Sequence, residues 1–116
     1  MKAKDLLDEN EQALILFTDG TEFDIEDDKT GLTGKWKVNP ERVPDRIIIY
    51  FRDSSAKDGT VYSAINTGVA PSEIDGRHFI FLANIENVGS TDLDWVEFAE
   101  GGQNPVRYLT ETRNME

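Results

Sequence analysis

Apolar and polar residues alternate over much of the chain, and one stretch departs from that alternation. Residues 46–52, Arg-Ile-Ile-Ile-Tyr-Phe-Arg, place five apolar or aromatic side chains in a row between two arginines. In a strand, successive side chains point to opposite faces, so Ile48 faces one side while Ile47 and Ile49 face the other. Because both faces are apolar, the pattern predicts a strand covered on both sides, around which the rest of the chain is arranged.

Strand-like patterns recur on either side of this central stretch. Further strands are predicted over residues 12–18, 21–25, 34–38, 60–68, 78–88 and 106–110. The dipeptide Asp19-Gly20 separates the first two of these segments and predicts a hairpin with a type I′ turn, in which both central residues have positive φ. In the segment 78–88, Val88 breaks the alternation, which predicts a β-bulge near Asn87.

Residues 91–101 fit two structures. The pattern favours a short helix, because Trp95, Phe98 and Ala99 would share one apolar face at helical spacing. Thr91 would then be the N-cap, since its side-chain oxygen can accept a hydrogen bond from the first turn. The alternative is a hairpin strand from Trp95 to Ala99, and the sequence leaves this choice open.

The number of segments and the turn signals between them indicate the fold class. About six or seven short strands with one or two short helices are typical of a mainly β protein, and predict a small, largely antiparallel β-barrel or sandwich. The length of 116 residues fits one domain over residues 1–116, with residues 1–10 as a docked or frayed segment and 111–116 as a polar tail. No apolar run approaches the ~20 residues of a membrane helix, and no signal peptide is recognisable, so a cytoplasmic protein without membrane contact is expected.

Charge is distributed unevenly along the chain. The formal net charge is −11, and the first 30 residues hold ten acidic against three basic residues. A strongly acidic protein repels nucleic acid at long range, so bulk nucleic-acid binding is disfavoured. Residues 5–28 could instead meet a basic protein partner or mimic nucleic acid, as a phage-type inhibitor or adaptor would.

The sequence lacks the residues that most catalytic and metal sites require. There is no cysteine, and no glycine-rich loop that would hold a phosphate. Asp24, Glu26 and Asp28 have the spacing of a calcium-binding loop, but Lys29 occupies the position that requires glycine. His78 is the only histidine and stands in no recognisable catalytic arrangement. We therefore predict no catalytic residue, metal or cofactor, and the alternative is a hydrolase that uses His78.

Half of the basic residues of this acidic chain lie in one stretch between residues 35 and 57. Within it, Trp36 stands between two lysines, where it could be a core residue or could stack on a planar ligand at a cavity rim. The predicted ligand-binding residues are Trp36, Lys37, Arg52, Arg77 and Trp95. The function predicted first is a non-catalytic module that binds a planar or anionic small ligand, such as a nucleobase or nucleotide. The second is the acidic interaction module described above.

Four segments also suggest a family. They are Gly34-Lys-Trp36, the central strand 46–52, the returning strand 60–65 and the run 77–82. In strand order and texture, the chain from Trp36 to Tyr108 resembles the PUA-like barrel superfamily, which includes the EVE, ASCH and YTH families. The resemblance implies a small barrel that binds nucleic acid or a modified base in an aromatic-walled pocket.

Overall fold

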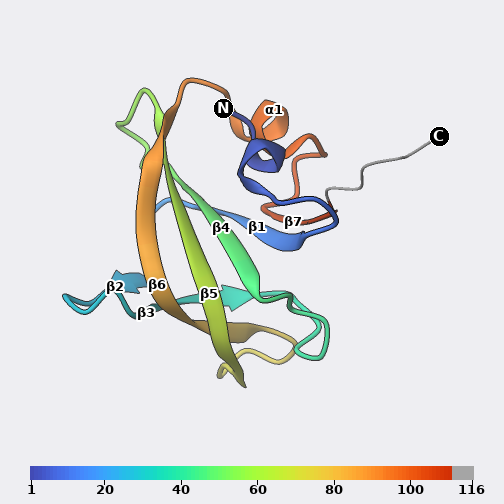
Figure 1. Ribbon diagram of the computed structural model, residues 1–116. Coiled ribbons are helices and arrows are strands. Elements are labelled where there is room, and N and C mark those ends of the chain that lie inside the picture. The colour runs from blue at the N-terminus through green and yellow to red at the C-terminus, as the bar shows by residue number, and fades with distance from the viewer. Residues whose placement is uncertain (111–116) are drawn as a thin grey trace.

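A computed structural model describes residues 1–110, so the predicted polar tail at 111–116 lies outside the described residues. Seven strands form one sheet (Figure 1). They are β1 (Gln12–Thr18), β2 (Phe23–Ile25), β3 (Gly31–Trp36), β4 (Arg46–Phe51), β5 (Gly59–Pro71), β6 (His78–Thr91) and β7 (Val106–Thr110). Two short helical elements accompany them, the 3-10 helix η1 (Ala3–Leu6) and the α-helix α1 (Trp95–Ala99).

The prediction of a mainly β fold with a buried central strand is confirmed. The strand order is β2-β3-β6-β5-β4-β1-β7, which places β4 inside the sheet. Every pair is antiparallel except β1 with β4, which is parallel, so the sheet is mixed. Residues 47–50 are fully buried. The apolar residues on both faces of β4 therefore supply side chains to two separate cores.

The first core lies between the sheet and the two helical elements. Ile48 and Tyr50 of β4 pack there with Trp95 and Phe98 of α1. Ala3 is also buried in this core, together with Leu7, so the segment 1–10 is docked against the sheet. Figure 1 shows η1 and α1 together beside β1 and β4, on the side of these strands that faces away from β3.

The second core fills the concave side of the sheet, which is strongly curled. Leu16 of β1 and Trp36 of β3 belong to the same cluster of buried side chains, although their strands are far apart in the strand order. The rings of Phe23 and Phe51 lie 6.1 Å apart between centroids, again joining distant parts of the sheet. The curl therefore brings β3 across from β1 and buries both faces of the central strands.

The finer prediction of a barrel or sandwich is wrong, because the strands form a single sheet and that sheet stays open. Within residues 1–110, β2 pairs only with β3 and β7 pairs only with β1, which leaves two edges. The chain that follows β3 contains Asn39-Pro40 and Pro44. Proline has no N–H to donate to a ladder, so this segment is poorly suited to continue β3 into a pairing with β7. The seven strands of the sheet agree with the six or seven predicted from the sequence.

The hairpin predicted between residues 12 and 25 is also wrong. β1 pairs with β4 and β7, whereas β2 pairs with β3. Of the two turn residues only Gly20 has positive φ (+107°), and the Asp19 carboxylate accepts a hydrogen bond from the Thr21 N–H at 3.0 Å. The physical reason is that β1 is apolar on both faces, which favours the sheet interior over a hairpin with an acidic edge strand.

The helix is the correct choice for residues 91–101, with a later start than predicted. β6 continues to Thr91, and α1 begins after Asp94, whose carboxylate accepts a hydrogen bond from the Glu97 N–H at 2.9 Å. Asp94 is therefore the N-cap in place of Thr91.

The predicted bulge is confirmed, because the pairing of β5 with β6 shifts register between Asn87 and Gly89.

Candidate functional site

The two tryptophans predicted to bind a ligand lie in different cores. Trp36 belongs to the concave core, where its indole N–H donates to the Thr33 hydroxyl at 3.0 Å. Trp95 belongs to the core beneath α1, and its N–H donates to the Asn104 carbonyl at 2.9 Å. Both indoles are buried. The structure therefore does not bring them to a common ligand cavity, and each has the contacts of a core residue.

The predicted basic residues are likewise placed apart. The Arg77 guanidinium donates to the Lys35 carbonyl at 3.1 Å, and the Arg52 guanidinium donates to the Ala56 carbonyl at 3.3 Å. Arg52 and Trp95 do line one small cavity of about 290 Å³, but Asp94 lines it as well. The positive charge of Arg52 is therefore opposed there by a carboxylate.

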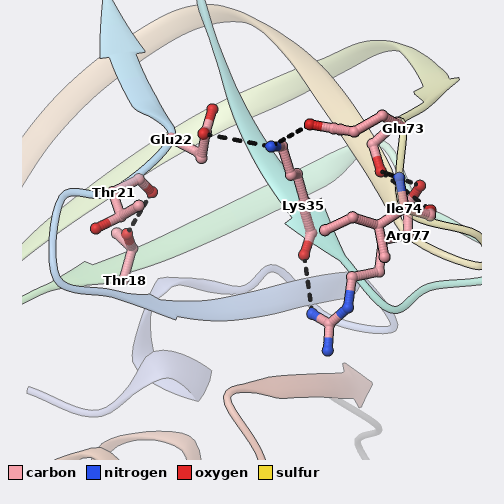
Figure 2. Close-up of polar contacts among 8 residues, drawn as sticks. Thr18, Thr21, Glu22, Lys35, Glu73, Ile74 and Arg77 are labelled. Carbon is pink, nitrogen blue, oxygen red and sulfur yellow. Dashed lines mark hydrogen bonds and ion pairs between the residues drawn. The ribbon is translucent and has the colours of Figure 1, made fainter.

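Lys35 is the centre of an ion cluster that joins three segments (Figure 2). Its ammonium lies 3.6 Å from a carboxylate oxygen of Glu22 and forms an ion pair with Glu73 in the turn between β5 and β6. The hydrogen bond from Lys35 holds the pKa of Glu73 below its usual value, and the same bond raises the pKa of Lys35. This basic residue is therefore neutralised by acids and does not offer a site for an anion.

The Lys35–Glu73 pair gives a pH-dependent contribution to stability. Because the pKa of Glu73 is lowered on folding, its contribution is present above the unfolded value of about 4.5 and is lost as pH falls through the folded-state pKa. We expect Glu73→Gln to lower the melting temperature slightly at pH 7, and the difference from the wild type to shrink below about pH 4. Thermal melts of both proteins from pH 7 to 3 test this, and a difference that stays constant would contradict it.

The cavity with the clearest chemical character lies where the sheet fails to close. We call it the seam cleft. It is bordered by the start of β1, the end of β7 and the segment between β3 and β4, with a volume of about 560 Å³. Its lining residues are Gln12, Ala13, Lys37, Val38, Asn39, Arg42, Pro44, Tyr108, Leu109 and Thr110. A cleft of this size is within the range of small-molecule sites.

The seam cleft is positively charged in an otherwise acidic protein. Among the described residues that line the cleft, only Lys37 and Arg42 are charged at neutral pH, and none is a carboxylate. Neither forms an ion pair with a carboxylate of residues 1–110. Four other cavities bordered by described residues contain one or two carboxylates each. The seam cleft is therefore the cavity of this set that suits an anion.

An aromatic ring lines the same cleft as these two cations. Tyr108 of β7 is 44% exposed, and it pairs with Leu14, whose side chain lies in the concave core. Directly paired residues project to the same face, so Tyr108 faces the concave side at the edge of the sheet. Gln12 and Asn39, which carry side-chain amides, also line the cleft. The arrangement combines a planar surface for stacking, two charges for an anion and two amides that donate and accept hydrogen bonds.

Of the five residues predicted to bind a ligand, only Lys37 lines the seam cleft. Arg42 and Tyr108 were not predicted as site residues. Arg42 belongs to the basic stretch noted in the sequence, and the turn at Asn39-Pro40 places it near Lys37. Tyr108 carries no such signal, because its approach to Lys37 depends on the curl of the whole sheet.

The structure also bears on the histidine, the metal site and the membrane helix that were considered from the sequence. His78 is the first residue of β6, and its Nδ1 is enclosed without a hydrogen-bond partner among residues 1–110. Within the same residues, no group of three or more His, Cys, Asp or Glu side chains is arranged to hold a metal ion. No helix of the described part is long and apolar enough to cross a membrane.

Comparison with known proteins does not identify a family. No family model, curated protein or solved structure matches this chain. The resemblance to the PUA-like superfamily therefore stays a prediction, and the functional argument depends on the residues themselves.

Proposed function

We propose that this protein is a non-catalytic module that binds a small anionic ligand with a planar group in the seam cleft. A nucleotide has both of these features. In the proposed complex, Lys37 and Arg42 bind the anionic group, while the planar group stacks on Tyr108. The observation that carries the proposal is the pair of cations lining one cavity, with no carboxylate among the described residues of its lining.

Electrostatics supports this assignment over the other cavities. The net charge of −11 repels an anion at long range, so a binding site for one needs a local concentration of positive charge. An arginine can also hold a phosphate or carboxylate through two parallel hydrogen bonds. The cavity beside Trp95 offers aromatic rings and Arg52, but Asp94 opposes an anion there.

Stacking contributes the second part of the proposed recognition. Base–aromatic stacking is worth roughly 1–3 kcal/mol per base, which corresponds to about tenfold or more in affinity. Tyr108 is exposed enough to offer a ring face, whereas the two tryptophans are buried. The proposal therefore keeps the ligand class predicted from the sequence but assigns it to Tyr108 and Arg42 in place of Trp36 and Trp95.

The proposal is tested by calorimetric titration with adenosine monophosphate, adenosine and inorganic phosphate. We expect the monophosphate to bind more tightly than either of its two parts, because only it engages both the cations and the ring. Arg42→Ala and Tyr108→Ala should each weaken its binding by about tenfold or more. Both residues are exposed, so neither change should prevent folding.

Lys57→Ala provides the matched control. Lys57 is exposed in the loop between β4 and β5 and does not line the cleft. Its replacement by alanine removes one positive charge, as Arg42→Ala does. We expect it to change the affinity less than twofold, since exposed charges at a distance are largely screened by salt. No binding of the monophosphate, or an equal loss with Lys57→Ala, would refute the seam cleft as its site.

A further inference from the structure

We infer that the convex face of the sheet at β2, β3 and β6 is a docking surface for a basic segment of a partner protein. This inference is independent of the seam cleft. It starts from the strand pairing, in which Asp24 lies opposite Leu32 and Leu32 lies opposite Phe81. Directly paired residues project to the same face. An acidic, an aliphatic and an aromatic side chain therefore follow one another across three neighbouring strands.

The side on which this row projects is fixed by its neighbours along β6. Ile80 and Leu82 are buried in the concave core. Successive side chains of a strand alternate, so Phe81 projects to the convex side. The helical elements η1 and α1 pack with Ile15 of β1 and Ile48 of β4, away from this part of the sheet (Figure 1). Phe81 is accordingly 40% exposed.

The convex face is hollowed at this point. A groove of about 560 Å³ has Leu32, Phe81 and Ala83 in its lining, with Asp24 and Glu26 on the side of the edge strand β2. Gly68 lies opposite Phe81 on β5, so the residue paired with Phe81 has no side chain to cover the ring, and Thr67 of the same strand lines the groove. An apolar floor with a ring open on one side can accept the aliphatic stem of a long side chain.

Charge complementarity identifies the occupant. Among the described residues that line the groove, only Asp24 and Glu26 are charged, and neither forms an ion pair with a base of residues 1–110. They belong to the stretch 19–28, which has six acidic residues and no basic one. The aliphatic part of an arginine or lysine side chain in the groove would pack against the ring of Phe81. Its positively charged group would then lie beside the carboxylates of Asp24 and Glu26. The surrounding acidic stretch would attract such a segment from a distance.

A pair of synthetic peptides tests the inference. The first peptide alternates three arginines with leucines, and the second replaces each arginine by glutamate. Binding is followed by amide chemical shifts of the isotope-labelled protein, which also locate the contact. We expect the arginine peptide alone to shift amides of β2, β3 and β6. We expect Phe81→Ala and the double variant Asp24→Asn/Glu26→Gln each to weaken its binding by about tenfold.

The control variant Asp8→Asn/Glu9→Gln removes the same net charge from exposed positions outside both the groove and the stretch 19–28. It should leave the affinity within about twofold if the groove itself binds the peptide. An equal loss in the control would show attraction by the overall charge and would overturn the inference, as would shifts confined to other strands. Concentration-dependent dimerisation that Phe81→Ala abolishes would identify a second copy of the chain as the occupant, and would also overturn it.

Discussion

Truncating the central strand at Ile48 or Ile49 is expected to destabilise the protein by about 2–5 kcal/mol in either case. Both side chains are fully buried, but they belong to different cores. Each truncation removes apolar contact and leaves a cavity that the packed neighbours fill only in part. Since the free energy of unfolding of a domain of this size is typically roughly 5–15 kcal/mol, either change would remove a large part of it. Urea unfolding followed by circular dichroism measures the effect.

Ile65→Ala is the control for this pair of truncations. Ile65 lies on the neighbouring strand β5, directly opposite Arg46, and is 38% exposed. Ile65→Ala removes the same side-chain atoms as Ile48→Ala and Ile49→Ala, but much of the Ile65 side chain already contacts water. We expect its cost to be clearly smaller than that of either buried isoleucine. Equal costs for the buried and exposed isoleucines would mean that β4 is not enclosed on both faces.

The central strand was predictable because its pattern is local. Five consecutive apolar residues with alternating directions require cover on both faces, whatever the order of the strands. The bulge near Asn87 and the apolar face of α1 were predictable for the same reason, since a period along the chain is visible in the sequence. Strand pairing is not local in this sense. Asp19-Gly20 has the composition of a hairpin turn, but the parallel pairing of β1 with β4 decides where β1 lies.

The open sheet was beyond prediction for a related reason. Closing a barrel requires consistent strand tilt and register around the whole ring, and these depend on pairings between distant residues. Short apolar strands with regular turns are found both in closed barrels and in curled open sheets. The prolines that follow β3 are visible in the sequence, yet their effect depends on the strand that would have faced them, which is β7.

For the candidate site too, the features that are local in the sequence were predicted, and those that depend on distant segments were not. The sequence marked the basic stretch that contains Lys37 and Arg42, because charge composition is read directly from the residues. It did not indicate that Tyr108 lines the same cleft, since this cleft lies between the last described strand and the segment after β3. The tryptophans drew attention as potential stacking platforms, but large aromatic side chains are just as often used to fill a core.

The largest single effect is expected at Phe98, the buried residue by which α1 is anchored to the sheet. Phe98 is fully buried, and its ring lies 5.1 Å from the ring of Tyr50 between centroids. We expect Phe98→Ala to cost about 3–5 kcal/mol, because it removes a whole aromatic side chain from beneath a helix of only five residues. A helix this short is not stable by itself, so its order depends on this packing.

Val96→Ala on the same helix separates packing from helix formation. Val96 is 40% exposed and lies two residues from Phe98, on the side of α1 away from the core. Alanine also favours a helix more than valine does, so this change should leave the free energy of unfolding within about 0.5 kcal/mol. Urea unfolding of the two variants gives the comparison, and amide hydrogen exchange should show lost protection in α1 for Phe98→Ala alone. A small cost at Phe98, close to that at Val96, would mean that α1 does not cover the core formed by Ile48 and Tyr50.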